Sequence, residues 1–334
     1  VVCAHSLSCK FFAIHFMAAM RLSSLAFLFG WVLQCYAKRP GGMLLLELNV
    51  DNNATHKLLW SKTESFLQQE VSGSKFAYVW YLADGDENIA CAILVAASVV
   101  TSNGLRANTD LVAIYDGNVP GKERFEKLGI KLIHVDEAAS KGSTATWRDS
   151  FLKLRAAELF QYDRVIYFDV DALPLASLDN LFDIAKFPVE IAAPRAYWLS
   201  QPFVQSGGPM VIDPRKIFYD RDFSKPMDAS VGIVGGEMDW VNSQFRDRID
   251  VLDGFYALLI GEWCESDGIY QHWQKQFGKG PDWLLENAAM VHFIATWKPW
   301  RITTESLLKE QCPKSQPQLL QVFQKWWSAK AKVC

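Results

Sequence analysis

The stretch "FLKLRAAELFQYDRVIYFDVDALPL", residues 151–175, combines the two patterns that decide the fold. Its first half has the apolar spacing of an amphipathic helix, and "RVIYFD" at 164–169 is an apolar run of strand length. The run ends in Asp169, and Asp171 follows two residues later. Two carboxylates this close repel each other unless a cation neutralises them. The stretch therefore predicts a helix that leads into a buried strand, with an acidic pair at the end of the strand.

Strand and helix patterns alternate before this stretch as well as within it. Strand patterns occupy 76–83, 110–117 and 131–136, and helix patterns occupy 87–101, 121–129 and 147–160. Strands separated by helices of this length favour parallel pairing through right-handed crossovers. Near-continuous apolar runs are typical of strands that are covered on both faces. We therefore expect an α/β fold with a doubly wound, mostly parallel nucleotide-binding sheet, whose ligands lie at the carboxyl ends of the strands.

Composition and missing motifs exclude several classes of protein. The 334 residues are 50% hydrophobic and 21% charged, which is typical of a globular chain. A net charge of −3 disfavours a nucleic-acid-binding protein, because a basic face would raise the total. The sequence has no G-x-G-x-x-G after its first strand pattern, no P-loop, no G-x-S-x-G elbow and no C-x-x-C pair. These absences argue against dinucleotide enzymes, P-loop nucleotidases, serine hydrolases and zinc–cysteine sites.

The beginning of the chain indicates a targeting segment. Residues 20–37 start with Arg21, continue as an apolar stretch and end in small residues, which is the layout of a secretory signal. We assign 1–37 to a signal peptide or, as the alternative, an uncleaved signal anchor, and 1–19 need not belong to the natural product. A polar stem or lead-in, 38–74, follows. We therefore expect the protein to enter the secretory pathway.

Two further features bear on the compartment. Asn53-Ala54-Thr55 is an acceptor sequon for N-glycosylation, although such triplets often occur by chance. Four cysteines follow the targeting segment: Cys91, Cys264, Cys312 and Cys334. They are too few for a disulfide scaffold, but one bridge is permitted in an oxidising lumen.

A second block of sequence carries candidate ligands. "MVHFIATWKPW", residues 290–300, places His292 at the end of an apolar strand and Lys298 on the following turn. An imidazole can serve as a third ligand to Mn²⁺ beside two carboxylates, and a lysine can meet a diphosphate as a point charge. The plainer alternative is a loop aspartate with a helix cap, together with a core histidine. The combination of both blocks favours a divalent metal centre.

At these blocks the chain resembles glycosyltransferase family 8, the group that contains glycogenin and the galactinol synthases. The resemblance covers about residues 75–300 and rests on four blocks in the right order: "FLKLRAAELFQYDRVIYFDVDALPLASLDNLF", "SGGPMVIDP", "GGEMDWVNSQF" and "HFIATWKPW". It implies a single GT-A domain over 75–300, which a C-terminal helical tail, 301–334, follows. It also implies retaining transfer of a hexose from a UDP-sugar donor to a glycan or another hydroxyl acceptor. Together with the targeting segment, it implies residence in the Golgi lumen or on the Golgi membrane, with secretion as the alternative.

The resemblance assigns roles to residues of this chain. The implied ligands of Mn²⁺, or of Mg²⁺, are Asp169, Asp171 and His292. The implied contacts to the donor are Lys298, Lys153, Tyr81, Asp169, Gly207 and Gln205. The implied catalytic residues are Glu237, which would hold the sugar or back its reactive face, and Lys153.

The chain departs from the family pattern near the expected sugar. Gln205 replaces a common Asn, Met238 replaces the Gln of many members after the acidic Glu237, and an acidic position near Arg195 is missing. A thioether cannot donate a hydrogen bond, so the choice of sugar and the strength of catalysis stay open. One alternative is therefore an impaired member that binds a nucleotide sugar or glycan without turnover. A haloacid-dehalogenase-type phosphatase fits less well, because its D-x-D motif opens the domain and here strand–helix sequence precedes it.

Overall fold

The computed structural model describes residues 32–39, 42–49, 75–83, 85–135, 149–184, 191–199, 203–214, 237–245, 248–264, 272–294 and 297–334. The chain divides into two compact units, Val1–Gln69 and Glu70–Cys334. In the first unit, β1 (Val32–Arg39) and β2 (Gly42–Asn49) form an antiparallel hairpin. Most of the predicted targeting segment and the sequon at Asn53 lie outside the described residues. No helix in the described ranges is long and apolar enough to cross a membrane.

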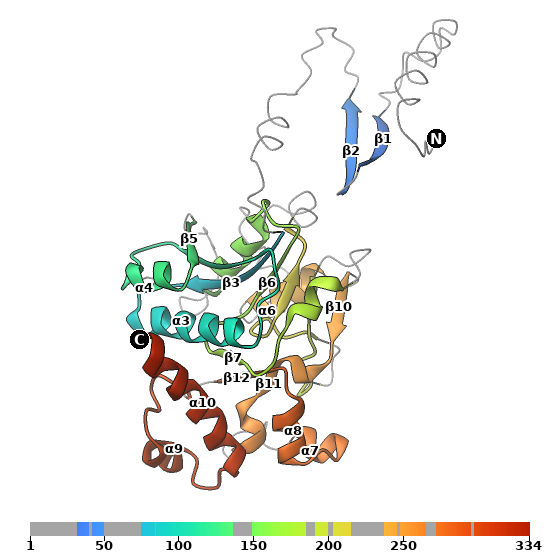
Figure 1. Ribbon diagram of the computed structural model, residues 1–334. Helices are drawn as coiled ribbons and strands as arrows, with labels where there is room; N and C mark the ends of the chain where they lie inside the picture. The colour runs from blue at the N-terminus through green and yellow to red at the C-terminus, as the bar shows by residue number, and fades with distance from the viewer. Residues whose placement is uncertain are drawn as a thin grey trace, which may run out of the picture. The chain divides into compact units, whose positions relative to one another are not determined.

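The second unit is built on a seven-stranded sheet with the order β10-β8-β9-β6-β3-β4-β5 (Figure 1). Its strands are β3 (Phe76–Leu82), β4 (Thr109–Tyr115), β5 (Ile130–His134), β6 (Arg164–Tyr167), β8 (Ile191–Pro194), β9 (Met210–Ile212) and β10 (Ile249–Leu252). Neighbouring strands are parallel except at β9, which runs antiparallel to both β6 and β8. The predicted α/β class and mostly parallel sheet are confirmed.

Helical segments cover both faces of this sheet, as the apolar strands predict. Successive side chains of β3 point to opposite faces. Tyr78 and Trp80 belong to the same hydrophobic cluster as most of the buried residues of α3 (Glu87–Ser102). Val79 belongs instead to the cluster that contains the buried residues of η3 (Asp149–Glu158). Because both faces are covered, the strand needs an apolar side chain at nearly every position.

The remaining helical elements are of two types, α-helices and 3₁₀ helices. The α-helices are α4 (Lys122–Lys127), α6 (Glu237–Gln244), α7 (His272–Phe277), α8 (Pro281–Asn287), α9 (Glu305–Gln311) and α10 (Pro317–Val333). The 3₁₀ helices besides η3 are η4 (Asp179–Asp183), η6 (Gly254–Ala257) and η7 (Ile260–Trp263). The helix predicted over 147–160 is present as the 3₁₀ helix η3. The sequence could not distinguish a 3₁₀ helix from an α-helix, because apolar residues three apart fit both.

A smaller sheet with the order β11-β12-β7 carries part of the site. Its strands are β7 (Ala172–Pro174), β11 (Leu258–Leu259) and β12 (Met290–His292). β12 runs antiparallel to β7, and His292 pairs with Ala172, which follows Asp171 directly. The predicted strand before His292 is confirmed, and it brings the imidazole to the acidic pair.

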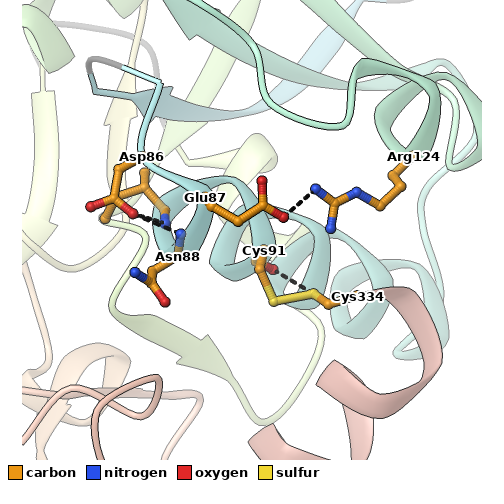
Figure 2. The surroundings of a disulfide bond; sticks show 7 residues. Asp86, Glu87, Asn88, Cys91, Arg124 and Cys334 are labelled. Atoms are coloured by element: carbon orange, nitrogen blue, oxygen red, sulfur yellow. Dashed lines mark hydrogen bonds and ion pairs between the residues drawn. A yellow bond between two sulfur atoms is a disulfide. The ribbon is translucent and has the colours of Figure 1, made fainter.

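Two disulfides fasten the C-terminal helices to the second unit. Cys264 is bonded to Cys312, and Cys91 of α3 is bonded to Cys334. Figure 2 shows the Cys91–Cys334 bridge between α3 and α10, beside an ion pair of Glu87 with Arg124. The sequence permitted one bridge, whereas the structure has two. The last part of the chain contains α9 and α10, and one face of α10 is buried in the core.

Candidate functional site

Three possible metal ligands meet just beyond the ends of β6 and β12. Asp169 and Asp171 lie in the turn after β6, and His292 is the last residue of β12. One ligand atom from each residue lies within 4.8 Å of the ligand atoms of the other two. The imidazole Nε2 of His292 is 3.1 Å from Oδ1 of Asp171. The structure therefore brings together the three residues that the sequence predicts as metal ligands.

Gly207 allows this close approach. The N–H of Asp169 donates to the Gly207 carbonyl at 3.2 Å. A Cβ atom on residue 207 would lie 2.3 Å from Cε1 of His292, a distance that no side chain tolerates. Because β9 is antiparallel to β6, the segment that precedes β9 lies at the edge where β6 ends. Glycine at this position thus leaves room for the imidazole beside the acidic pair.

A buried ion cluster holds Asp169 from another side. The Lys153 ammonium donates to Oδ2 of Asp169 at 3.0 Å and to Oε1 of Glu237 at 2.6 Å. The Ser206 hydroxyl donates to Oε1 of Glu237 at 2.8 Å, and the Tyr167 hydroxyl donates to Oδ1 of Asp169 at 2.9 Å. Sequence reasoning missed Tyr167 and Ser206. The spacing of two residues between Tyr167 and Asp169, which places both on one side of an extended chain, was the available signal.

The charges of the site shift one another's pKa values. Burial lowers the pKa of Lys153, but its two carboxylate partners outweigh burial and hold that pKa above its ordinary value. Burial raises the pKa of Asp169, although the Lys153 cation opposes the change. Burial also acts to raise the pKa of Asp171, but His292 and Lys298 bring it well below the ordinary value. Lys153 is therefore a permanent cation, and Asp171 is firmly ionised.

Lys298 lies beside the ligands and is held by the chain around it. Its ammonium pairs with Asp171 and donates to the carbonyl of Phe293 at 2.7 Å. The N–H of Phe293 donates to the Asp171 carbonyl at 2.8 Å. Lys298 is thus fixed next to the point where the three ligands meet, where an ammonium group can meet a diphosphate.

The residues present fit a divalent cation. Two carboxylates and an imidazole are a donor set suited to Mn²⁺, and the carboxylates alone suit Mg²⁺. The carboxylates of Asp169, Asp171 and Glu237 exceed the ammonium groups of Lys153 and Lys298 by one negative charge. A divalent cation would offset this excess and the repulsion between the two aspartates.

The remaining predicted residues, Gln205 and Tyr81, have partners outside the three possible metal ligands. Gln205 is buried, and its Nε2 donates to the carbonyls of Ala257 at 3.0 Å and Arg195 at 3.3 Å. Its Oε1 is buried and has no partner among the described residues. Tyr81 lies near the end of β3 and packs in the core cluster under the sheet. Gln205 therefore ties two loops together, and donor binding by Tyr81 stays a prediction.

Comparisons with known proteins place this geometry in a wider context. No family model matches the chain. Glucose N-acetyltransferase 1 of Aspergillus fumigatus is 31% identical over 219 residues, which are 59% of this chain and 54% of that protein. UDP-glucuronate:xylan alpha-glucuronosyltransferase 2 of Arabidopsis thaliana is 25% identical over 67% of this chain and 35% of that protein. The chain therefore spans about half of the first of these two curated relatives and about a third of the second.

Structural similarity defines the fold. A galactosyltransferase, LgtC, solved with donor and acceptor sugar analogues, superposes with a TM-score of 0.56 at 16% identity, over 77% of this chain and 96% of LgtC. The chain therefore has the GT-A fold of glycosyltransferases, as predicted. Its similarity in sequence to a named glucuronosyltransferase and in structure to a galactosyltransferase confirms the predicted resemblance to glycosyltransferases.

Proposed function

We propose that this protein is a retaining, metal-dependent glycosyltransferase that moves a hexose from a UDP-sugar to a glycan or another hydroxyl acceptor. The observation that carries the proposal is the meeting of Asp169, Asp171 and His292 at the carboxyl edge of a GT-A sheet, with Lys298 beside them. The glycosyltransferase relatives support the class of reaction. UDP as the nucleotide and retention of configuration follow from the resemblance to family 8.

The site residues divide the work on the donor. A bound Mn²⁺ or Mg²⁺ would act as a Lewis acid that stabilises the departing diphosphate. Asp169, Asp171 and His292 would hold the ion, and Lys298 would place a second positive charge at the leaving group. Lys153 contributes differently, because it keeps Asp169 and Glu237 in fixed positions through its buried hydrogen bonds.

Glu237 is our candidate for the group beside the reacting sugar. Its carboxylate is buried and is fixed by Lys153 and Ser206. A preorganised negative charge stabilises an oxocarbenium-like sugar more than its neutral ground state. The other carboxylates in the described part of the site are the proposed metal ligands. We therefore propose that the departing phosphate takes the proton of the acceptor hydroxyl.

We propose a site of action in the secretory pathway, in the Golgi lumen or at the Golgi membrane. Two disulfides in the second unit support an oxidising compartment, because such bonds are rare in the cytosol. The signal-like pattern at 20–37 and the sequon at Asn53 agree with this compartment.

Metal-dependent release of UDP tests the proposed function. The protein is incubated with UDP-glucose, UDP-galactose, UDP-N-acetylglucosamine, UDP-xylose or UDP-glucuronate, each with and without Mn²⁺. We expect release from at least one donor that needs the metal, and a loss of about a hundredfold in Asp169→Asn. The control is Asp183→Asn, which changes an exposed carboxylate paired with Arg106 and should keep full activity. Equal release by Asp169→Asn and wild type would refute the proposal.

A second candidate function is binding without turnover, and Met238 is the observation that favours it. Met238 stands in the first turn of α6 beside Glu237, where many family members have an amide side chain. Saturable, Mn²⁺-dependent binding of UDP, measured by calorimetry, together with no release from any donor would support this candidate.

A further inference from the structure

The C-terminal arm, residues 305–334, is fastened at two points. It consists of α9, α10 and the turn between them. The Cys264–Cys312 bridge holds the end of α9. The Cys91–Cys334 bridge holds the end of α10 (Figure 2). The buried face of α10 belongs to the cluster that also contains Trp263, Val291 and Phe293. The arm is thus a fixed part of the second unit, although it follows the predicted catalytic domain in the sequence.

The arm touches the segment that carries Lys298. We call this segment the site loop, and its described residues are 293, 294 and 297–302. The ring of Phe323 in α10 packs edge to face on Phe293, with 5.1 Å between centroids, and both rings are fully buried. The indole N–H of Trp327 donates to the carbonyl of Ile302 at 2.8 Å. The arm therefore holds the site loop near its beginning and at its end.

Phe293 connects these contacts to the site. It follows His292 directly, its N–H donates to the carbonyl of Asp171, and its carbonyl accepts from Lys298. A displacement of Phe293 would therefore move a metal ligand on one side and the diphosphate contact on the other. Small displacements of this kind are costly, because misplacing reacting groups by about 1 Å can reduce a rate by about a hundredfold.

We infer that Phe323 is a positioning residue of the site, and that the C-terminal arm holds the site loop so that Asp171, His292 and Lys298 stay together. Phe323 acts through Phe293 and touches none of the three directly in the contacts described above. The identity of the ligands that the site binds rests on the proposed function. The contacts between the C-terminal arm and the site loop do not, because they belong to the fold.

Amide hydrogen exchange tests the link without metal, donor or activity. The test variant is Phe323→Leu, which removes the ring contact and keeps an apolar side chain. The matched control is Phe125→Leu, because Phe125 is also fully buried but belongs to the cluster around α3 and α4. We expect residues 290–302 to exchange about tenfold faster in Phe323→Leu and at the wild-type rate in Phe125→Leu. Unchanged exchange of these residues in Phe323→Leu would overturn the inference.

A milder variant covers the case in which Phe323→Leu does not fold. Trp327→Phe keeps an aromatic ring but is smaller than the indole and lacks the N–H that donates to Ile302. We expect faster exchange at residues 297–302 in this variant, with β3 unaffected. Exchange that is unchanged in the site loop of Trp327→Phe would likewise count against the inference.

Metal binding and kinetics separate this inference from the proposed function. Phe323→Leu should weaken Mn²⁺ binding about tenfold, and Phe125→Leu should not change it. Faster exchange in Phe323→Leu with no sugar transfer by wild type would support the link and refute the transferase proposal. Normal transfer with unchanged exchange would refute the link and support the transferase proposal.

Discussion

Lys153 lies between the carboxylates of Asp169 and Glu237 and is only 4% exposed. We predict that Lys153→Met lowers the free energy of unfolding by roughly 3–5 kcal/mol, because it leaves two buried carboxylates without their cation. Urea unfolding measures the change. Lys309→Met is the control, since the side chains of Lys309 and its partner Glu305 are 69% and 47% exposed, and exposed pairs contribute about 1 kcal/mol or less. Equal losses in the two variants would contradict the prediction.

Gly207 leads to a prediction about metal affinity. In Gly207→Ala the new methyl group would collide with the His292 ring, so the imidazole must move away from the acidic pair. We expect Mn²⁺ binding, measured by calorimetry, to weaken by a factor of about 10–100. The matched control is Gly280→Ala, because a Cβ there meets nothing within 4 Å and the backbone is extended. Wild-type affinity in Gly207→Ala would show that metal binding does not depend on the close approach of the ring to residue 207.

Glu262 gives a prediction about pH. Its side chain is 0% exposed, and both carboxylate oxygens accept the N–H of Trp273. Burial raises the pKa of Glu262 from 4.5 to about 7, although these hydrogen bonds act to lower it. Between these values the folded protein holds a proton that the unfolded chain does not hold. The stability from this group is therefore complete below about pH 4.5 and is lost as the pH rises through about 7.

The variant Glu262→Gln removes this titration and keeps an oxygen for the Trp273 N–H. The interval from 4.5 to about 7 corresponds to a difference of roughly 3 kcal/mol. We expect the free energy of unfolding of wild type to fall more between pH 5 and pH 8 than that of Glu262→Gln, as measured with urea. The same pH dependence in both proteins would rule out Glu262 as its source.

Sequence patterns located most of the site residues, for a physical reason. Asp169, Asp171 and His292 each follow or end an apolar run, and a charged group at the end of a buried strand stands out. Tyr167 and Ser206 could not be assigned in the same way. The spacing of two residues could have indicated that Tyr167 contacts Asp169. The Ser206 hydroxyl meets Glu237 because β9 is antiparallel and α6 begins at Glu237, and neither fact is visible in the sequence.

At the scale of elements, strands and helices were predictable where their apolar periods are long. The predicted strand at 76–83 and helix at 87–101 correspond to β3 and α3 within one residue at each end. The apolar period of a strand indicates which side chains are buried, but it does not indicate whether the strand runs parallel or antiparallel to its neighbours. The antiparallel direction of β9 could therefore not be predicted. The two- and three-residue strands of the smaller sheet are too short to show a period at all.

The disulfides lead to a prediction for the C-terminal arm. Four cysteines allow three pairings, so the sequence could not choose between them. We expect the double variant Cys91→Ala/Cys334→Ala to lose roughly 2–5 kcal/mol of stability, measured by thermal unfolding, because the bridge closes a long loop of the unfolded chain. Dithiothreitol should lower the melting temperature of wild type. It should not change the melting temperature of a variant in which all four of these cysteines are replaced. No loss in the double variant would mean that the bridge does not form.

For the molecule as a whole, the sequence predicts the fold and the class of enzyme. It predicts less well how far folding depends on disulfide bonds. A single bridge was allowed, and the structure has two within one compact unit. We predict that expression in a reducing cytosol gives far less soluble folded protein than expression in an oxidising compartment, measured by size-exclusion chromatography. Equal yields, and equal melting temperatures of the two products, would argue against disulfide-dependent folding.

The Cys91–Cys334 bridge also sets an order of events during translation. The two cysteines are 243 residues apart, so Cys91 leaves the ribosome roughly 12–50 s before its partner at ordinary rates of synthesis. Cys264 and Cys312 leave the ribosome between Cys91 and Cys334, so either of them can form a non-native disulfide with Cys91. Where Cys91 has formed such a non-native bond, thiol exchange must release it before Cys91 can pair with Cys334. Maturation of this protein should therefore depend on a disulfide isomerase, and the bond to Cys334 should be the last to form.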